Sequence, residues 1–337
     1  MQTPYFSIVI PVYNGLTHDL PKCLDSIWNQ PLDKELYEVI CVDDCSTDNT
    51  RVWLKEQQKA HCNLHIIENE INIRQGGGRN KGVKAAKGEY IVFIDQDDYY
   101  HHDGIARAYD HLQKNDLDIL IVDCAYQSPG KESNKLQHNF PHRHIMTGDE
   151  IIEKNSIPYA PWKFIFKRSL MIEKELFFVE NERFEDVDWV HKLVHYGNKV
   201  QYQPILFIHY NKTPISTTMS AFGNKGLIYC GLRVATRLNT IKNTVFLKSN
   251  KNVRNEIQKI IELTYYINLR YFFFFYDNYR SKTNIIKTSF KDYNESPTYT
   301  LVKLAKQAPK TFSIVSNILY PICKSGFIVY RYIKYHL

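Results

Sequence analysis

The chain has 337 residues, of which 44% are hydrophobic, and it carries a formal net charge of +7. This length and apolar content suffice for one large domain or two ordinary ones. The seven cysteines show no C-x-x-C or other metal-ligand spacing, which favours free thiols in a reducing compartment and argues against a disulfide framework.

The net charge conceals two halves of opposite sign. Residues after 224 hold 19 Lys and Arg but only 5 Asp and Glu, which leaves the preceding part acidic. A basic half rich in Tyr and Phe indicates an anionic lipid surface or an anionic polymer as partner. No zinc-finger, RRM or KH signature is present, so we expect no nucleic acid.

The first 125 residues alternate between strand and helix patterns. Apolar residues spaced along one stripe predict a helix over Leu20–Trp28, and Ser46 is the expected N-cap of the next helix. This alternation predicts an α/β fold with a doubly wound, mostly parallel sheet. The strands are expected at Phe6–Ile10, Tyr37–Val42, Leu64–Ile67, Tyr90–Ile94 and Leu117–Val122.

Three carboxylates, on Asp95, Asp97 and Asp98, follow the fourth apolar run directly. Ligands bind at the carboxyl ends of strands in open α/β sheets. Asp95 and Asp97 share one side if the backbone stays extended, and a divalent cation relieves their repulsion most simply. The stretch therefore predicts a metal site for a phosphate-bearing substrate. The plainer interpretation is a polar strand end that caps the next helix.

Six short motifs follow one another along the chain. They are Ser7-Ile-Val-Ile-Pro-Val-Tyr-Asn14, Val42-Asp-Asp-Cys-Ser-Thr-Asp48, Asn72 to Gly82, Asp95-Gln-Asp-Asp98, Trp162-Lys163 and Phe184-Glu-Asp186. In order and spacing they resemble the motifs of family 2 glycosyltransferases, which have the GT-A fold. The resemblance covers roughly residues 1–220 and implies a GT-A catalytic domain there, with 221–337 as a helical C-terminal region.

The chain departs from the family pattern at three points. Cys45 stands where Gly is usual, Gly76–Gly78 stand where the family often has small side chains, and Lys163 follows Trp162 without a spacer. Neither of the first two changes removes a contacting group. The resemblance implies an inverting transferase that moves a sugar from a nucleotide-diphosphate sugar, expected to be a UDP-sugar, to a glycan or lipid-linked acceptor in cell-surface polysaccharide synthesis.

The donor-binding residues implied by the resemblance are spread over four motifs. Asp44 is expected to contact the uracil base, and Tyr13 to stack on it. Arg79 is expected to begin a helix and to bind a phosphate through two guanidinium N–H groups. Backbone N–H groups at the start of that helix are expected to bind the same phosphate. The full set is Pro11, Tyr13, Asp44, Asn72, Arg79 and Asp95. The alternative for Asp44 is a turn aspartate that holds its own loop, and we expect a structural role for Asp43.

The expected metal ligands are Asp97 and Asp95, and the expected cofactor is Mn²⁺ or Mg²⁺. The cation would neutralise charge on the leaving diphosphate. The resemblance assigns the general base to Asp186, with Glu185 as the second candidate. Acidic residues are also common in the first helical turn for dipole reasons alone.

Trp162 and Lys163 are the expected acceptor-binding residues, because an aromatic ring suits a sugar face. The alternative is core packing of Trp162 beside a solvated Lys163. His209 lies where some GT-A enzymes carry a metal-ligating histidine, but a lone histidine is more often structural, and we expect that here.

Residues 225–337 are expected to be mostly helical and to rest on the inner membrane face or on the acceptor side of the sheet domain. Aromatic residues among Lys and Arg, as in Tyr265-Tyr266, Tyr271 to Tyr276 and Phe327 to Tyr335, suit a headgroup interface. The alternative is an ordinary helical subdomain whose aromatics face its own core.

The first strand starts near Phe6, which leaves no room for a signal peptide, and no clean apolar stretch of about 18 residues is present. We therefore expect a cytoplasmic protein, either free or peripheral at the inner face of the plasma membrane. Two other function classes stay open. One is a non-catalytic module that binds nucleotide sugars or glycans, and the other is a nucleotidyltransferase.

Overall fold

The computed structural model describes residues 3–127, 136, 140, 143–154, 157–211, 225–275, 279–290, 293 and 300–310. The chain divides into two compact units, residues 1–213 and 214–337.

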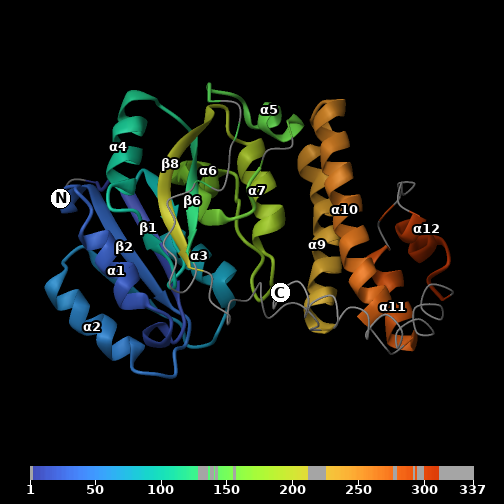
Figure 1. Cartoon of the computed structure of the whole chain (residues 1–337), viewed down its shortest axis with the longest axis horizontal. Helices are drawn as coiled ribbons and strands as arrows, with labels where there is room; N and C mark the ends of the chain where they lie inside the picture. The colour runs from blue at the N-terminus through green and yellow to red at the C-terminus, as the bar shows by residue number, and fades with distance from the viewer. Residues whose placement is uncertain are drawn as a thin grey trace, which may run out of the picture. The chain divides into compact units, whose positions relative to one another are not determined.

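Within the described residues, the first unit is built on an eight-stranded sheet of order β3-β2-β1-β4-β7-β6-β8-β5 (Figure 1). β7 runs antiparallel to β4 and β6, β5 runs antiparallel to β8, and the other neighbours are parallel. The mostly parallel sheet is thus confirmed. Its strands are β1 (Phe6–Val12), β2 (Tyr37–Asp43), β3 (Leu64–Glu68), β4 (Tyr90–Phe93), β5 (Tyr99–Tyr100), β6 (Ile119–Gln127), β7 (Phe164–Lys167) and β8 (Val200–Asn211).

Continuous apolar runs form the central strands, and every residue of β1, β2 and β4 is buried. Such runs suit strands covered on both faces, because neither face has to meet water. The α-helices of this unit are α1 (Leu20–Trp28), α2 (Thr50–Ala60), α3 (Arg74–Ala85), α4 (Gly104–Lys114), α5 (Gly148–Glu153), α6 (Arg168–Glu173) and α7 (Asp186–His195). The helix expected over Leu20–Trp28 is confirmed.

Ser46 is not the cap of the second helix, so that prediction is wrong. α2 begins at Thr50, whose backbone N–H donates to Oδ1 of Asp48 at 3.0 Å. The Ser46 hydroxyl instead accepts from the backbone N–H of Asn14 at 2.9 Å. Ser46 therefore ties together the two loops that follow β1 and β2.

The glycine run lies inside α3 rather than in a loop before it. α3 begins at Arg74, so Arg79 lies in its second turn and does not open the helix. The glycines serve close packing instead. A Cβ at Gly76 would lie 2.9 Å from the carbonyl oxygen of Val179. One at Gly82 would lie 2.3 Å from Cγ1 of Val9. The glycines thus let α3 lie directly against β1 and against the segment before α7.

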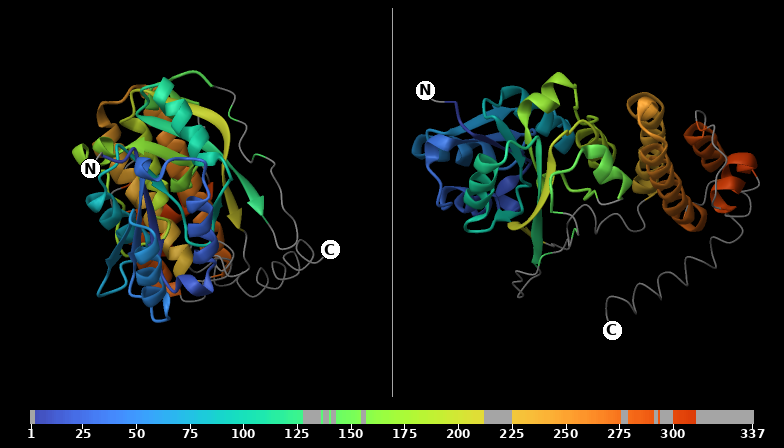
Figure 2. Two further views of the ribbon diagram at one scale, coloured as in Figure 1. Left: turned by 90° about the vertical axis from the view of Figure 1, so that its left-hand side faces the viewer. Right: turned by 90° about the horizontal axis from the view of Figure 1, so that it is seen from above.

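The described residues of the second unit are mostly helical. This unit contains α9 (Lys225–Thr244), a short 3₁₀ turn (Val245–Lys248), α10 (Lys251–Phe275), α11 (Tyr279–Ser289) and α12 (Thr300–Gln307). Figure 2 shows α9 and α10 side by side, and they make the most extensive helix–helix contact of this unit. The expected helical C-terminal region is therefore confirmed.

A buried core fills the second unit. Leu238, Ile257 and Ile261 are fully buried, and the buried Tyr265 ring stacks on Phe290 with centroids 4.5 Å apart. Tyr265 thus faces its own core, as the plainer alternative holds. The side chains of Tyr271 to Tyr276 and the tail Phe327 to Tyr335 lie outside the described residues. In the part of the chain that is described, no helix has the length and apolar character to cross a bilayer.

Candidate active site

Three of the expected donor residues, Tyr13, Asp44 and Asp95, follow the parallel strands β1, β2 and β4, which are adjacent in the sheet. The carboxyl ends of these strands therefore meet at one edge. Pro11 lies inside β1. The side chain of Gln96, inside the D-x-D motif, both accepts from the backbone N–H and donates to the carbonyl of Tyr13, each at 2.9 Å. This pair fixes the D-x-D turn beside the loop after β1. The side chain of Tyr13 stays 42% exposed, so its ring is accessible to a base.

Asp44 is buried, and both of its carboxylate oxygens accept hydrogen bonds. Oδ1 accepts from the Asn69 amide at 2.9 Å and from the Ile73 N–H at 2.8 Å, and Oδ2 accepts from the Arg74 N–H at 2.7 Å. Asp44 thus holds the start of α3. Oδ2 has one protein donor among these bonds, so the predicted base contact stays a prediction. The exposed Asn72 donates to the Asp44 carbonyl at 3.1 Å.

Asp43 has the structural role that we expected. It is fully buried at the end of β2, and one of its carboxylate oxygens pairs with Nε of Arg51. The same oxygen accepts from the backbone N–H of Ser46 at 3.2 Å. Asp43 therefore anchors α2 and the loop before it to the sheet.

Arg79 bridges two parts of the site that lie far apart in the sequence. Its Nη2 donates to Oδ1 of Asp95 and its Nη1 to Oε1 of Glu185, both at 2.8 Å. The guanidinium is buried, and its carbon lies 5.4 Å from the ring centroid of Phe178. Burial alone would lower the pKa of Arg79, but the two carboxylates outweigh it and raise that pKa. The predicted phosphate contact stays a prediction, and these ion pairs favour a positioning role.

Asp97 and Asp98 follow Asp95 in a tight turn. Burial, and next the nearby charge of Asp95, raises the pKa of Asp97 to about 6. Asp98 does not cap the following helix. It is buried and accepts from the backbone N–H of Asn211 at the end of β8, at 2.8 Å. Asp98 therefore positions the turn, and Asp97 is the more exposed of the two carboxylates.

Asp186 is the first residue of α7, and Glu185 is its N-cap residue. Burial, and next the adjacent Glu185, raises the pKa of Asp186 to about 7. One carboxylate oxygen of Asp186 is buried and accepts no hydrogen bond from the described part of the chain. Glu185 accepts a hydrogen bond from Arg79, whereas one carboxylate oxygen of Asp186 remains available to accept a proton. This difference favours Asp186 over Glu185 as the general base.

Trp162 and Lys163 lie in a 3₁₀ turn (Pro161–Lys163) just before β7, and both are only 6% exposed. Trp162 stacks on Tyr210 with centroids 5.7 Å apart. Nζ of Lys163 pairs with Oδ1 of Asp123 at 3.1 Å, and the Tyr202 hydroxyl donates to the other oxygen of Asp123. Burial thus favours a structural role, and their predicted acceptor contact stays a prediction. The solvated Lys163 of the alternative is wrong.

His209 is part of a histidine pair rather than a lone histidine. Its Nε2 lies 2.9 Å from Nδ1 of His101, and its Nδ1 lies 2.6 Å from the amide of Gln127. Burial lowers the pKa of His209 to about 4 and also lowers the pKa of His101. Because both ring nitrogens of His209 have side-chain partners, the structure favours the structural role that we expected.

The sequence pattern of Glycosyl transferase family 2 matches residues 7–174, the stretch that holds the strand-end carboxylates and Arg79. The chain belongs to this family. Among curated relatives, the poly(ribitol-phosphate) beta-glucosyltransferase of Bacillus spizizenii is 46% identical over 117 residues, which are 34% of this chain and 18% of that protein. The putative glycosyltransferase EpsH of Bacillus subtilis is 27% identical over 275 residues, 78% of this chain and 76% of that protein. The chain thus spans less than a fifth of the first relative's length.

Solved structures share the fold of this family 2 chain. Staphylococcus aureus TarS 1–349 in complex with UDP-GlcNAc has a TM-score of 0.67 at 19% identity, over 96% of this chain and 91% of that one. A mannosyltransferase of Pyrobaculum calidifontis, in complex with GDP-Man and Mn²⁺, has a TM-score of 0.54 at 16% identity, over 95% and 88%. At these identities the likeness shows the fold, and it confirms the GT-A prediction with a C-terminal helical region.

Sequence reasoning missed two features of the site. The first is the bridge from Arg79 to Glu185, which are 106 residues apart. An arginine in a glycine-rich segment, with two acidic motifs elsewhere in the chain, was the available signal. The second is the grouping of His101 and His102 with His209 at the β5–β8 pair. The adjacent histidines just after the D-x-D motif could have drawn attention to it.

Proposed function

We propose that this family 2 chain transfers a sugar with inversion from a UDP-sugar to a glycan or lipid-linked acceptor in cell-surface polysaccharide synthesis. The observation that carries the proposal is the buried Arg79 bridge. It joins Asp95 of the D-x-D motif to Glu185, the neighbour of Asp186. Donor-side carboxylates and a candidate base thereby belong to one electrostatic network.

The donor set at the D-x-D turn fits Mn²⁺ or Mg²⁺, because Asp95 and Asp97 offer only carboxylate oxygens. Burial first, and then the charge of Asp95, raises the pKa of Asp97, and a cation bound beside these carboxylates would offset both effects. When bound, the cation would neutralise charge on the leaving diphosphate. Asp97 is the ligand that we propose first. Asp95 is the second, with its other oxygen held by Arg79.

Asp186 is the proposed general base. Its carboxylate takes the proton of the acceptor hydroxyl while that oxygen bonds to the anomeric carbon. The bond from this carbon to the diphosphate oxygen breaks, and the electron pair leaves with UDP. One such displacement inverts the anomeric centre. A base whose pKa lies near the working pH combines the correct protonation state with proton affinity, and the pKa of about 7 for Asp186 meets that condition.

The names of the relatives and solved complexes support the donor and acceptor classes. TarS has been solved with UDP and with UDP-GlcNAc, which favours a UDP-sugar here. The relative from Bacillus spizizenii is named for a poly(ribitol-phosphate) acceptor, and an anionic polymer of this kind would suit the basic residues after 224. We further propose a peripheral location at the inner face of the plasma membrane.

The two other function classes make different predictions. A non-catalytic binding module would bind UDP-sugars but release no UDP. A nucleotidyltransferase usually has a Gly-rich, basic loop directly after its first strand, whereas this chain has Pro11-Val12-Tyr13-Asn14-Gly15 there. The buried Asp186 with a raised pKa favours catalysis over binding alone.

Calorimetry of UDP binding with and without Mn²⁺ tests the donor site. We expect Mn²⁺ to strengthen UDP binding to the wild-type chain. Asp97→Asn should lose this enhancement, because a neutral amide offsets less of the cation's charge. Asp110→Asn, at an exposed position of α4, is the matched control and should behave as wild type. Metal-independent UDP binding in the wild type, or full enhancement in Asp97→Asn, would overturn the metal assignment.

A further inference from the structure

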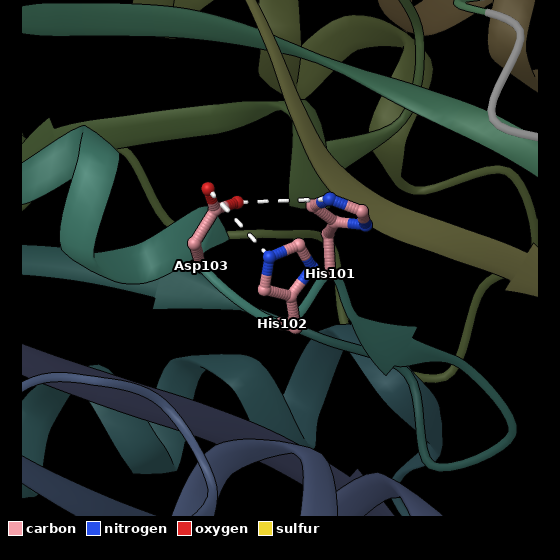
Figure 3. Close-up of side chains that lie close together, drawn as sticks. All are labelled: His101, His102 and Asp103. Carbon is pink, nitrogen blue, oxygen red and sulfur yellow. Dashed lines mark ion pairs between the residues drawn. The ribbon is translucent and has the colours of Figure 1, made fainter.

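A second cluster of metal-ligating side chains lies between β5 and α4, outside the proposed site. His101, His102 and Asp103 each offer one ligand atom, and these atoms all lie within 4.8 Å of one another. Figure 3 shows both imidazole rings turned toward the Asp103 carboxylate. Nε2 of His101 lies 3.6 Å from Oδ1, and Nε2 of His102 lies 3.9 Å from Oδ2.

These separations approach those of a zinc site. Zn²⁺ bonds of about 2.0–2.1 Å at tetrahedral angles place neighbouring ligand atoms about 3.4 Å apart. His102 has a side chain that is 78% exposed, so its ring can close the remaining gap without disturbing the core. Two imidazoles with one carboxylate suit Zn²⁺ or Co²⁺, whereas Mg²⁺ prefers oxygen ligands.

The surroundings hold His101 in place. Nδ1 of His101 is engaged by His209 at 2.9 Å, which leaves Nε2 as its available nitrogen. The His101 carbonyl accepts from Gln30 at 2.7 Å, and its N–H donates to the Phe207 carbonyl at 2.9 Å. Outer partners of this kind orient metal-binding histidines.

Asp103 supplies an independent sign of a missing partner. Its Oδ1 is buried and accepts no hydrogen bond from the described residues. The nearest cationic group on α4, Nη1 of Arg107, lies 4.0 Å from this oxygen, beyond hydrogen-bond range. A buried carboxylate oxygen without a donor is costly, and a cation between the two rings would satisfy it.

We propose that His101, His102 and Asp103 form a second cation site, selective for Zn²⁺ or Co²⁺ and separate from the D-x-D turn. The bound ion holds the three-residue connection between β5 and α4 in one conformation, with its remaining coordination position open to water. Because it binds the folded chain, it raises thermal stability by mass action.

The test is calorimetric titration with Zn²⁺ in the full chain carrying Asp97→Asn, which weakens metal binding at the D-x-D turn. This background should bind one Zn²⁺, and excess Mg²⁺ should not compete. Adding His102→Ala or Asp103→Asn should weaken that binding at least tenfold and abolish the rise in melting temperature. The matched control is His65→Ala, which removes a half-exposed histidine 3.4 Å from a carboxylate of Glu38 and should change neither result.

The proposal is overturned if the Asp97→Asn background binds no Zn²⁺. It is also overturned if His102→Ala and Asp103→Asn bind Zn²⁺ as tightly as the background, or if His65→Ala weakens binding equally. These results are independent of the transferase proposal, since they involve neither UDP nor turnover. If the chain binds Zn²⁺ as described but shows no Mn²⁺-dependent UDP binding, the result contradicts only the proposed function.

Discussion

Arg79 is the residue on which the geometry of the site depends most. It is buried between Asp95 and Glu185, and its removal would leave both carboxylates without their cation. Breaking a buried ion pair from one side typically costs about 3–5 kcal/mol of folding free energy. We therefore predict that Arg79→Ala lowers the free energy of unfolding in urea by about this amount and also weakens UDP binding.

Arg74→Ala is the control for Arg79, because it removes an exposed arginine from the same helix. It should leave the urea midpoint nearly unchanged. Wild-type stability and wild-type UDP affinity in Arg79→Ala would show that the bridge has no role in positioning the two carboxylates.

Asp186 carries the chemistry in our proposal. Asp186→Asn should retain UDP binding, because the residue lies at the start of α7 rather than at the strand ends. Transfer should fall by about 10²–10⁴-fold, the usual value of a positioned general base. Product formation under single-turnover conditions measures this, with Asp110→Asn as the control. If Glu185→Gln is inactive and Asp186→Asn is active, the two roles are exchanged.

The pKa of Asp186 also sets the pH dependence of transfer. The base works only when ionised, and its pKa is raised to about 7 by burial and then by Glu185. The rate should therefore rise with pH through about 7 and level off above it. A pH profile of kcat/KM measures this, because kcat/KM reports the pKa values of the free enzyme. A profile that is flat from pH 5 to 9 would count against Asp186 as the base.

At the scale of elements, the contact between α3 and β1 can be tested directly. Ala is favoured over Gly inside a helix by about 1 kcal/mol, but a Cβ at Gly82 would lie 2.3 Å from Cγ1 of Val9. Overpacking of this kind costs about 1–3 kcal/mol. We therefore expect the substitution to destabilise the fold on balance.

We predict that Gly82→Ala lowers the melting temperature, measured by circular dichroism. Gln75→Ala, at an exposed position in the first turn of α3, is the control and should leave it unchanged. A Gly82→Ala chain that melts above the wild type would mean that helix propensity, not packing against β1, decides at this position.

The sequence predicted the elements whose pattern is local. The apolar runs of β1, β2 and β4 stand out because these strands are buried on both faces. β8 was not predicted, because Gln201, Gln203 and Pro204 interrupt its apolar pattern. β5 was not predicted either, because it is only two residues long. α3 was placed too late because its glycines suggest a loop, whereas their reason is close packing against β1.

The candidate site divides in the same way. The D-x-D turn and Asp186 were accessible from motifs, because each motif is a short local pattern. The bridge through Arg79 was not, since it depends on how α3 packs against the segment before α7. The burial of Lys163 against Asp123, 40 residues away, was hidden for the same reason.

At the scale of the whole molecule, charge is the property that separates the two halves of the chain. The residues after 224 hold 19 basic and 5 acidic side chains. Each basic residue near an anionic leaflet contributes about 1 kcal/mol. We predict that the full chain floats with anionic vesicles but not with neutral ones, and that salt releases it because surface electrostatics are screened.

The flotation experiment has a matched pair of charge variants. Lys251→Gln with Arg254→Gln removes two exposed charges at the start of α10, and Lys55→Gln with Lys59→Gln removes two exposed charges on α2. Only the first pair should reduce recovery with anionic vesicles. Equal recovery on neutral and anionic vesicles would leave the second unit as an ordinary helical subdomain.

Release of UDP is the most direct test of the whole account. The wild-type chain is incubated with UDP-GlcNAc and with UDP-glucose, with and without a cell-envelope acceptor fraction, in Mn²⁺ and in EDTA. We predict UDP release from at least one donor, loss of release in EDTA, recovery with added Mn²⁺ and little release by Asp186→Asn. UDP-sugar binding without UDP release in any of these mixtures would contradict the account and indicate a non-catalytic binding module.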